Sequence, residues 1–183
     1  ALEHDPRSAN ALQGVGDSHL FRGDINSAIP HYRMALKRNP NLPASSQNLA
    51  AALRRLSQYA EAISVLESAV RHSPNDSELL AALAFALATA PQPHLRQGEH
   101  ALAYAKRALA AATRPRSNAL DAQAAALAEL GRFEAAAETG LRALDIAREH
   151  ESPDRVPALE QRLRSYRERR PYRDPAPPVP AIP

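Results

Sequence analysis

Three prolines, Pro6, Pro40 and Pro74, follow one another at intervals of 34 residues. Between the last two lie two runs of apolar residues at helical spacing, which meet at a short polar joint at Ser57 and Gln58. Each run has about a dozen residues, which is marginal for an isolated helix in water, so the runs must pack against each other and against neighbouring runs. Proline then ends the second run, because it lacks an N–H and its ring collides with the preceding turn. The spacing therefore predicts stacked pairs of helices.

Small residues recur at the same interval. Ala28 and Ala62 are 34 residues apart, and so are Gly16 and Ala50. We expect Gly16, Ala28 and Ala62 to be buried where two helices cross, because only small side chains fit there. This pattern resembles the tetratricopeptide repeat, which has a period of about 34 residues, small residues at the helix crossing and a closing proline. The resemblance implies an all-α fold, a right-handed superhelix or α-solenoid of about four helix–turn–helix repeats with a C-terminal capping helix.

The repeat boundaries follow from the prolines. We expect the end of a truncated preceding repeat at residues 1–6, repeat 1 at 7–40, repeat 2 at 41–74, repeat 3 at 75–113, repeat 4 at 114–150, the capping helix at 152–170 and a proline-rich tail at 171–183. The predicted helices are Ser8–Arg22, Ile25–Arg38, Pro43–Leu56, Tyr59–His72, Ser77–Thr89, Gly98–Ala112, Asn118–Leu130, Phe133–His150 and Pro157–Arg169. Asp76 or Ser77 is expected to cap the fifth of these helices. Since the sequence starts inside a repeat, we expect the C-terminal part of a longer protein, or a repeat that something outside the chain completes.

Repeat 3 contains an insertion at residues 90–97. The small residue expected near residue 96 is found at Ala101, so this repeat is longer by about five residues. Pro91 and Pro93 prevent a helix from continuing through the insertion. Two interpretations remain open, a tolerated surface loop and the lip of a binding surface.

Motifs and composition argue against catalysis. The sequence has no glycine-rich phosphate loop, no GxSxG, no HExxH and no cysteine. His94 and His100 flank the insertion beside Glu99, but their spacing across a loop is poor for metal coordination. We therefore expect a protein that is no enzyme and that has no cofactor and no metal site. The net charge of +3 comes almost wholly from arginine, a usage typical of GC-rich bacterial genomes, and no apolar run is long enough to span a membrane.

The resemblance also implies a binding groove. In this family the first helices of the pairs line an inner face that usually holds an extended peptide. At the matching positions this sequence has Gln13, Asp17, Phe21, Gln47, Asn48, Arg54, Arg55, Glu78, Phe85 and Asp121. Members that clamp the terminal carboxylate of a chaperone use lysine, asparagine and arginine side chains, of which only Asn48 is kept here. A chaperone-tail receptor is therefore disfavoured, and a solvated face without a ligand is the alternative to a peptide groove.

The C-terminal region is rich in arginine. Residues 161–173 contain six arginines and two tyrosines, a composition that can bind nucleic acid or another anion through phosphate contacts and stacking. Leu163 and Tyr166 are needed by the capping helix, however, so a solvated cap is the favoured interpretation and nucleic acid the remote alternative. Asn75 begins an Asn-Asp-Ser sequence, which is a possible glycosylation site.

Two functions fit these observations. The first is a structural protein that associates head to tail with copies of itself, because the two ends present unlike surfaces and such contacts give filaments when the rotation does not close. The residues expected between subunits are Leu2, Tyr166, Arg169, Arg170, Tyr172, Pro177 and Pro178. The second is a scaffold domain of a larger bacterial protein that binds a peptide or protein. Both predict protein partners, and a filament would favour an extracytoplasmic or extracellular location, which the sequence alone does not determine.

Overall fold

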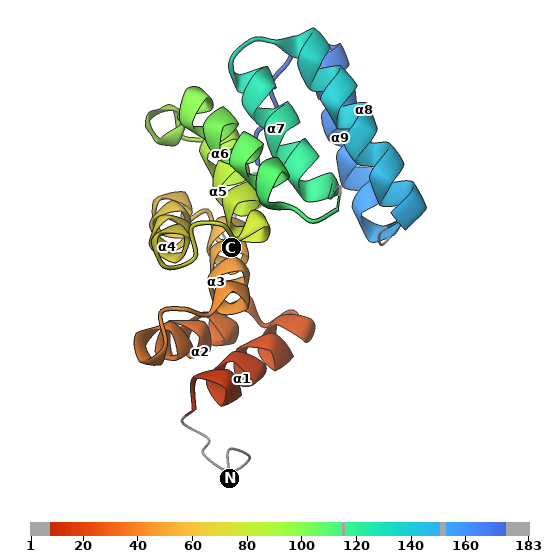
Figure 1. Cartoon of the computed structure of the whole chain (residues 1–183). Coiled ribbons are helices and arrows are strands. Elements are labelled where there is room, and N and C mark those ends of the chain that lie inside the picture. Colours follow the sequence, from red (N-terminus) through yellow and green to blue (C-terminus); the bar gives the residue numbers. More distant parts are fainter. Residues whose placement is uncertain (1–7, 115, 151–152, 175–183) are drawn as a thin grey trace, which may run out of the picture. The chain divides into compact units, whose positions relative to one another are not determined.

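A computed structural model describes residues 8–114, 116–150 and 153–174 (Figure 1). In these ranges the chain forms nine α-helices and two short 3-10 helices, and it contains no strand. The all-α class expected from the sequence is therefore confirmed. The predicted inter-subunit residues Leu2, Pro177 and Pro178 lie outside the described residues.

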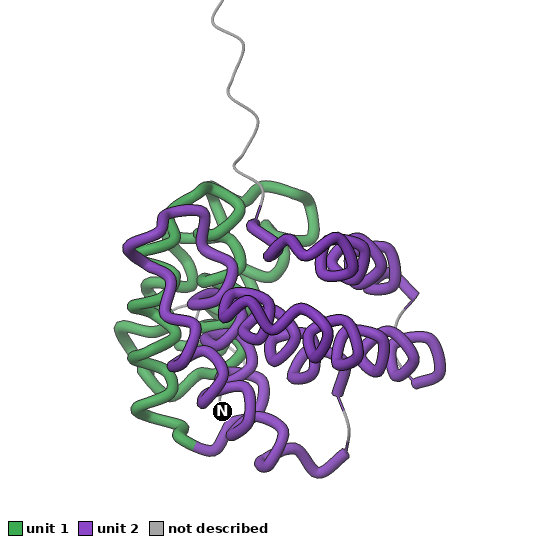
Figure 2. Tube along the Cα trace, turned by 90° about the horizontal axis from the view of Figure 1, so that it is seen from above, with its two compact units in different colours: residues 1–74, 176–183 green, residues 75–175 purple. Residues whose placement is uncertain are grey.

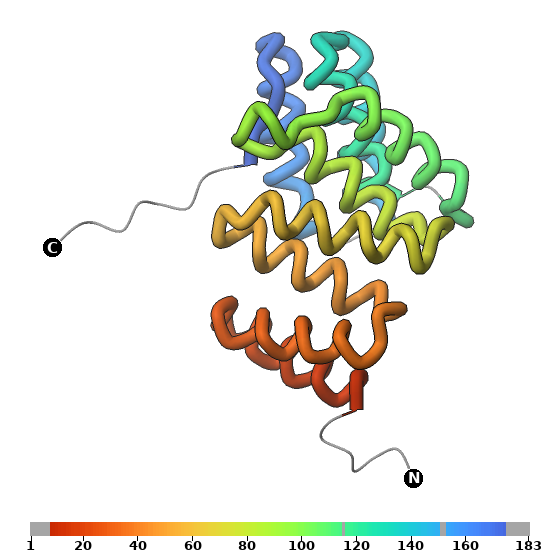
Figure 3. Tube along the Cα trace, turned by 90° about the vertical axis from the view of Figure 1, so that its left-hand side faces the viewer, coloured from red at the N-terminus to blue at the C-terminus, as the bar shows by residue number. Residues whose placement is uncertain are grey.

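The described residues form two compact units, residues 8–74 and residues 75–174, which Figure 2 shows in different colours. Unit 1 consists of α1 (Ala9–Phe21), α2 (Ile25–Arg38), α3 (Pro43–Arg55) and α4 (Tyr59–His72). Each helix packs against the next one along the chain (Figure 3). The four helices begin and end within one residue of the predicted bounds.

Unit 2 consists of α5 (Ser77–Thr89), the 3-10 helix η1 (Pro93–Leu95), α6 (Gly98–Ala111), α7 (Ser117–Glu129), α8 (Phe133–His150), the 3-10 helix η2 (Pro153–Arg155) and α9 (Val156–Arg167). Here α5 packs against both α6 and α7, α7 packs against α8, and α9 packs against α8. The helices again lie within two residues of the predicted bounds.

Local chemistry accounts for where several helices begin and turn. Asp76 is the N-cap of α5, and its Oδ1 accepts a hydrogen bond of 2.9 Å from the N–H of Leu79, as expected. The joints within three helix pairs each use a left-handed backbone conformation, at Gly23, Ser57 and Gly131, with φ of 78°, 59° and 74°. Gly23 and Ser57 are 34 residues apart. The same turn is thus built at equivalent places in the repeat.

The predicted helix crossings are confirmed in unit 1. Ala28 and Ala62 are fully buried, and Gly16 is buried against the ring of Tyr32. Val15, which precedes Leu49 by one period, is nevertheless 42% exposed. The reason is that α3 packs against both α2 and α4, whereas α1 packs chiefly against α2 among the described helices of its unit.

Candidate protein-binding surfaces

The polar residues predicted for the groove of unit 1 are bound to one another or to neighbouring helices. Asn48 Nδ2 donates to Asp17 Oδ1 at 2.9 Å, and the buried Tyr32 hydroxyl donates to the same oxygen at 2.7 Å. Ser45 Oγ donates to Gln13 Oε1 at 2.9 Å. These bonds join α1 to α2 and α3. They fix the spacing of the helices, so Gln13, Asp17 and Asn48 act first as structural links.

Burial and the carboxylate of Asp17 together keep the Tyr32 phenol protonated. Loss of solvation raises the pKa of Tyr32 well above its usual range, and the hydrogen bond to Asp17 raises it further. The phenol is therefore a lasting hydrogen-bond donor in this cluster.

Other predicted groove residues of unit 1 face solvent. Phe21, at the end of α1, is 94% exposed, and Arg55 at the end of α3 is also exposed. Gln47 is half-buried, and the half-buried Arg54 has an interaction partner. Phe21 lines a shallow surface hollow together with Val15, Asp17, Ser18 and Arg22. We call these five residues the α1 hollow.

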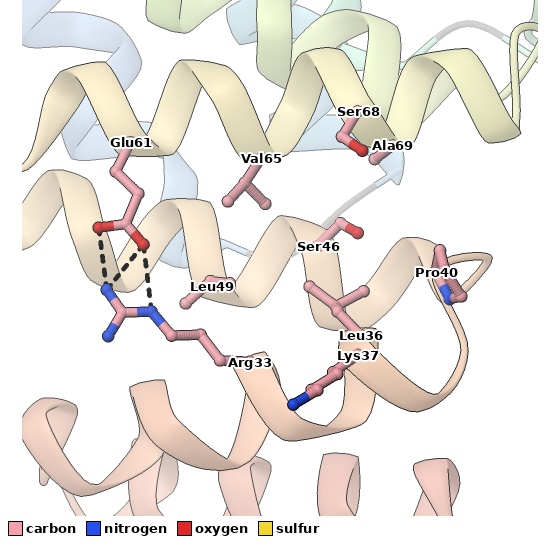
Figure 4. Close-up of a pocket in the computed structure, with 10 residues that line it drawn as sticks. All are labelled: Arg33, Leu36, Lys37, Pro40, Ser46, Leu49, Glu61, Val65, Ser68 and Ala69. Atoms are coloured by element: carbon pink, nitrogen blue, oxygen red, sulfur yellow. Dashed lines mark hydrogen bonds and ion pairs between the residues drawn. The ribbon is translucent and has the colours of Figure 1, made fainter.

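A second hollow in unit 1, which the sequence did not indicate, lies between α2, α3 and α4 (Figure 4). This pocket has a volume of about 350 Å³, and its apolar lining includes Leu36, Leu49 and Val65. Arg33 and Glu61 stand at one end, where Arg33 Nη2 donates to Glu61 Oε1 at 2.7 Å and to Oε2 at 2.9 Å. Its residues come from three helices and from Pro40 in the connection between α2 and α3, so no single stretch of sequence reveals it.

In unit 2, the predicted groove residues on α5 and α7 are already engaged within the unit. Asp121 is 4% exposed, and Arg162 of α9 binds it through two contacts of 2.8 Å, Nε to Oδ1 and Nη2 to Oδ2. Burial disfavours the charge of Arg162, but the facing carboxylate outweighs this effect and raises the pKa of Arg162. The expectation that Asp121 lines an open groove was therefore wrong, because α9 covers it. Glu78 accepts a hydrogen bond from Asn118 and pairs with Arg116.

Two tyrosines predicted at an interface between subunits are also held within unit 2. Tyr166 is 1% exposed and packs in a cluster with Ala124, Ala128 and Ala136. Tyr172 contacts the same cluster and lies beside the ring of Phe85, with 6.3 Å between the ring centroids. Tyr166 completes the core of its own unit, so the interface prediction was wrong for Tyr166. Tyr172 is half-buried at the edge of that cluster and stays a predicted interface residue. Arg169 and Arg170 remain exposed.

The arginines of residues 161–173 do not form one free cationic surface. Arg162 is paired with Asp121, and Arg173 Nη2 lies 2.5 Å from Glu129 Oε2. Arg169 and Arg170 pair with Glu134 and Glu168. Within the described ranges, no group of three or more histidine, aspartate or glutamate side chains is placed to hold a metal, and no helix there has the length and apolar character needed to cross a membrane.

Comparison with known proteins agrees with the repeat pattern. Residues 19–84 match the family model of the tetratricopeptide repeat. Residues 19–84 are therefore tetratricopeptide repeats, and the described helices have the fold of a tetratricopeptide-repeat solenoid. No curated protein sequence matches it.

Three solved structures are similar in fold. A thermophilic tetratricopeptide-repeat protein of Thermus thermophilus, TTC0263, has 22% identity and a TM-score of 0.68, over 91% of this chain and 85% of that one. MamA of Desulfovibrio magneticus RS-1, from residue 41 to its end, has 21% identity and a TM-score of 0.62, over 81% of each chain. PilW, a type IV pilus biogenesis factor, has 20% identity and a TM-score of 0.71, over 88% of this chain and 70% of that one. At these identities the likeness concerns the fold alone.

Proposed function

We propose that this chain is a non-catalytic interaction scaffold whose protein partner docks on the α1 hollow. The observation that carries the proposal is the exposure of Phe21, which is 94% accessible at the end of a well-formed helix. Covering a phenylalanine side chain contributes about 1.5–3 kcal/mol to association. Aromatic and arginine residues are also the types that most often dominate binding energy at protein interfaces.

The surroundings of Phe21 support the same surface. Val15 is 42% exposed in the same hollow, and Arg22 stands at its edge. Arg55 lies two turns after Asn48 on α3, and Asn48 is hydrogen bonded to Asp17, one turn before Phe21 on α1. Apolar surface thus lies near two exposed guanidinium groups. A partner segment with an apolar residue beside acidic ones fits this chemistry.

Site-specific photo-crosslinking tests the proposal. A photo-reactive amino acid at Ser18, inside the α1 hollow, should trap a discrete protein in extracts of the source cells. The matched control is the same amino acid at Met34, which is 43% exposed on α2 and should trap none of it. Phe21→Asp should abolish trapping from Ser18 without changing thermal stability, because Phe21 buries almost nothing. Equal trapping from both positions, or trapping unaffected by Phe21→Asp, would refute this assignment.

Head-to-tail self-association is the second candidate function, and the exposed apolar side chains of α1 favour it. Repeats bury their apolar faces by stacking on a neighbouring repeat, so a second copy could cover Val15 and Phe21. Repetition of that contact gives an array or filament when the rotation does not close. Since Tyr166 is buried within unit 2, the opposing surface would use residues with exposed side chains such as Arg169 and Arg170.

Sedimentation velocity over a wide range of protein concentration separates the two candidates. Self-association predicts larger species as concentration rises, and Phe21→Asp should remove them. If the chain is a monomer at every concentration and Ser18 crosslinks to a different protein, self-association is excluded and the function as a scaffold for another protein stands.

A further inference from the structure

The residues that follow α9 turn back onto the first helices of both pairs in unit 2. We call residues 170–174 the strap; it has no helical structure, and its end lies beside α5 (Figure 3). The N–H of Asp174 donates to the carbonyl of Thr89 at 3.0 Å. Thr89 is the last residue of α5, where carbonyl groups have no partner within the helix. The strap therefore supplies a backbone donor that α5 itself lacks.

Arg173 makes the charged contact of the strap. Its guanidinium lies 2.5 Å from Glu129 at the end of α7 and 3.5 Å from the carbonyl oxygen of Ala88. Positive charge is favoured at the C-terminal end of a helix, and here two such ends, of α5 and α7, face one guanidinium. The contact is also partly shielded from water, since the side chains of Arg173 and Glu129 are 30% and 16% exposed.

Tyr172 makes the aromatic contact. The guanidinium carbon of Arg162 lies 5.4 Å from the ring centre of Tyr172 and 5.2 Å from that of Phe85. A guanidinium within about 6 Å of an aromatic centre is attracted by the ring. Arg162 thus bridges an aromatic ring of the strap and one of α5.

The surface beneath the strap is held in place by contacts that do not involve the strap. Asp121 holds Arg162 in place. Glu129 also binds a second arginine, because Arg96 Nε donates to Glu129 Oε1 at 2.8 Å. Arg96 also donates to the carbonyls of Ala90 and Pro91 and so ties down the insertion at residues 90–97. The site would therefore keep its shape if the strap left, and a preformed site costs little to occupy again.

We propose that the strap is an internal ligand of a peptide-binding site on unit 2, and that an external peptide with an aromatic residue followed directly by arginine displaces it. Arg162 and Phe85 would receive the aromatic ring, Glu129 and the Ala88 carbonyl the arginine, and the Thr89 carbonyl a backbone N–H of the peptide. A tethered segment competes at an effective concentration of the order of millimolar, so the intact chain binds such a peptide weakly. The proposal is independent of the α1 hollow.

Fluorescence polarisation with a labelled peptide of residues 168–174 tests this site in the full chain. The double variant Tyr172→Ala with Arg173→Ala frees the strap and should bind the peptide about tenfold tighter or more than the wild type, because a larger fraction of the molecules has an open site. Adding Glu129→Gln should remove the gain, since glutamine keeps a group for Arg96 but has no charge for the peptide. A control peptide with alanine at both positions should not bind.

A second measurement needs no variant. Excess peptide added to the wild-type chain should accelerate hydrogen exchange of the Asp174 amide, because displacement of the strap breaks its bond to Thr89. The proposal is overturned if the double variant binds no tighter than the wild type, if the control peptide binds equally well, or if Asp174 exchange is unchanged at saturation. In those cases the strap is a fixed part of unit 2, whatever crosslinking at Ser18 shows.

Discussion

Replacing Gly16 by alanine should destabilise unit 1, although alanine is the better helix former. A Cβ atom at residue 16 would lie 2.8 Å from Cε1 and 3.0 Å from Cδ1 of Tyr32. Tyr32 is fully buried, and its hydroxyl donates to Asp17 at 2.7 Å. The ring therefore cannot move aside without weakening that bond or disturbing the packing of α2.

The expected size of the effect follows from opposing contributions. Alanine in place of glycine inside a helix stabilises by about 1 kcal/mol. Overpacking of a buried contact costs about 1–3 kcal/mol, and weakening the hydrogen bond between Tyr32 and Asp17 adds about 1 kcal/mol to that cost. The free energy of unfolding should therefore fall by about 1–3 kcal/mol in Gly16→Ala.

Gly14 provides a matched control on the same helix, because beyond the local helix itself no described part of the protein lies within 4 Å of a Cβ placed there. In Gly14→Ala the free energy of unfolding should rise by about 1 kcal/mol, because only the higher helix propensity of alanine acts there. Urea unfolding followed by circular dichroism measures both variants, with the same denaturant slope as the wild type. Equal stabilisation of the two variants would contradict the close crossing of α1 on Tyr32.

Three further variants test other parts of the structure. Ser57→Gly should raise the urea midpoint by relieving a left-handed conformation that costs about 1–2 kcal/mol for a residue with a side chain, and a lower midpoint would contradict this. Ala62→Leu should lower the melting temperature, because overpacking this fully buried site costs about 1–3 kcal/mol; an unchanged value would place the crossing elsewhere. Arg162→Met should lower the free energy of unfolding by about 3–5 kcal/mol, because it removes the cationic partner of the buried Asp121 carboxylate. Adding Asp121→Leu should recover most of that loss in urea unfolding, and a double variant no better than the single one would refute the pairing.

Several structural features were readable in the sequence because they depend on residues close together along the chain. The closing prolines end helices by local steric effects, and the predicted joint at Ser57 and Gln58 separates two helices. Ala28 and Ala62 could be assigned to buried crossings from their period alone, because a side chain larger than methyl would keep the two helices apart. For the same reason the helix bounds and the cap at Asp76 were predicted closely.

The contacts and the burial of the predicted groove residues were decided by the tertiary structure. Nothing local indicates that Asn48 and Asp17 satisfy each other, or that Asp121 is covered by an arginine from a helix 41 residues further on. Whether Tyr172 meets solvent, another molecule or Phe85 depends on the path of the chain after α9. Periodicity selects the face of a helix on which a side chain lies, because that follows from 3.6 residues per turn. Its partner depends on contacts between segments far apart in sequence, and these exist only once the helices have packed.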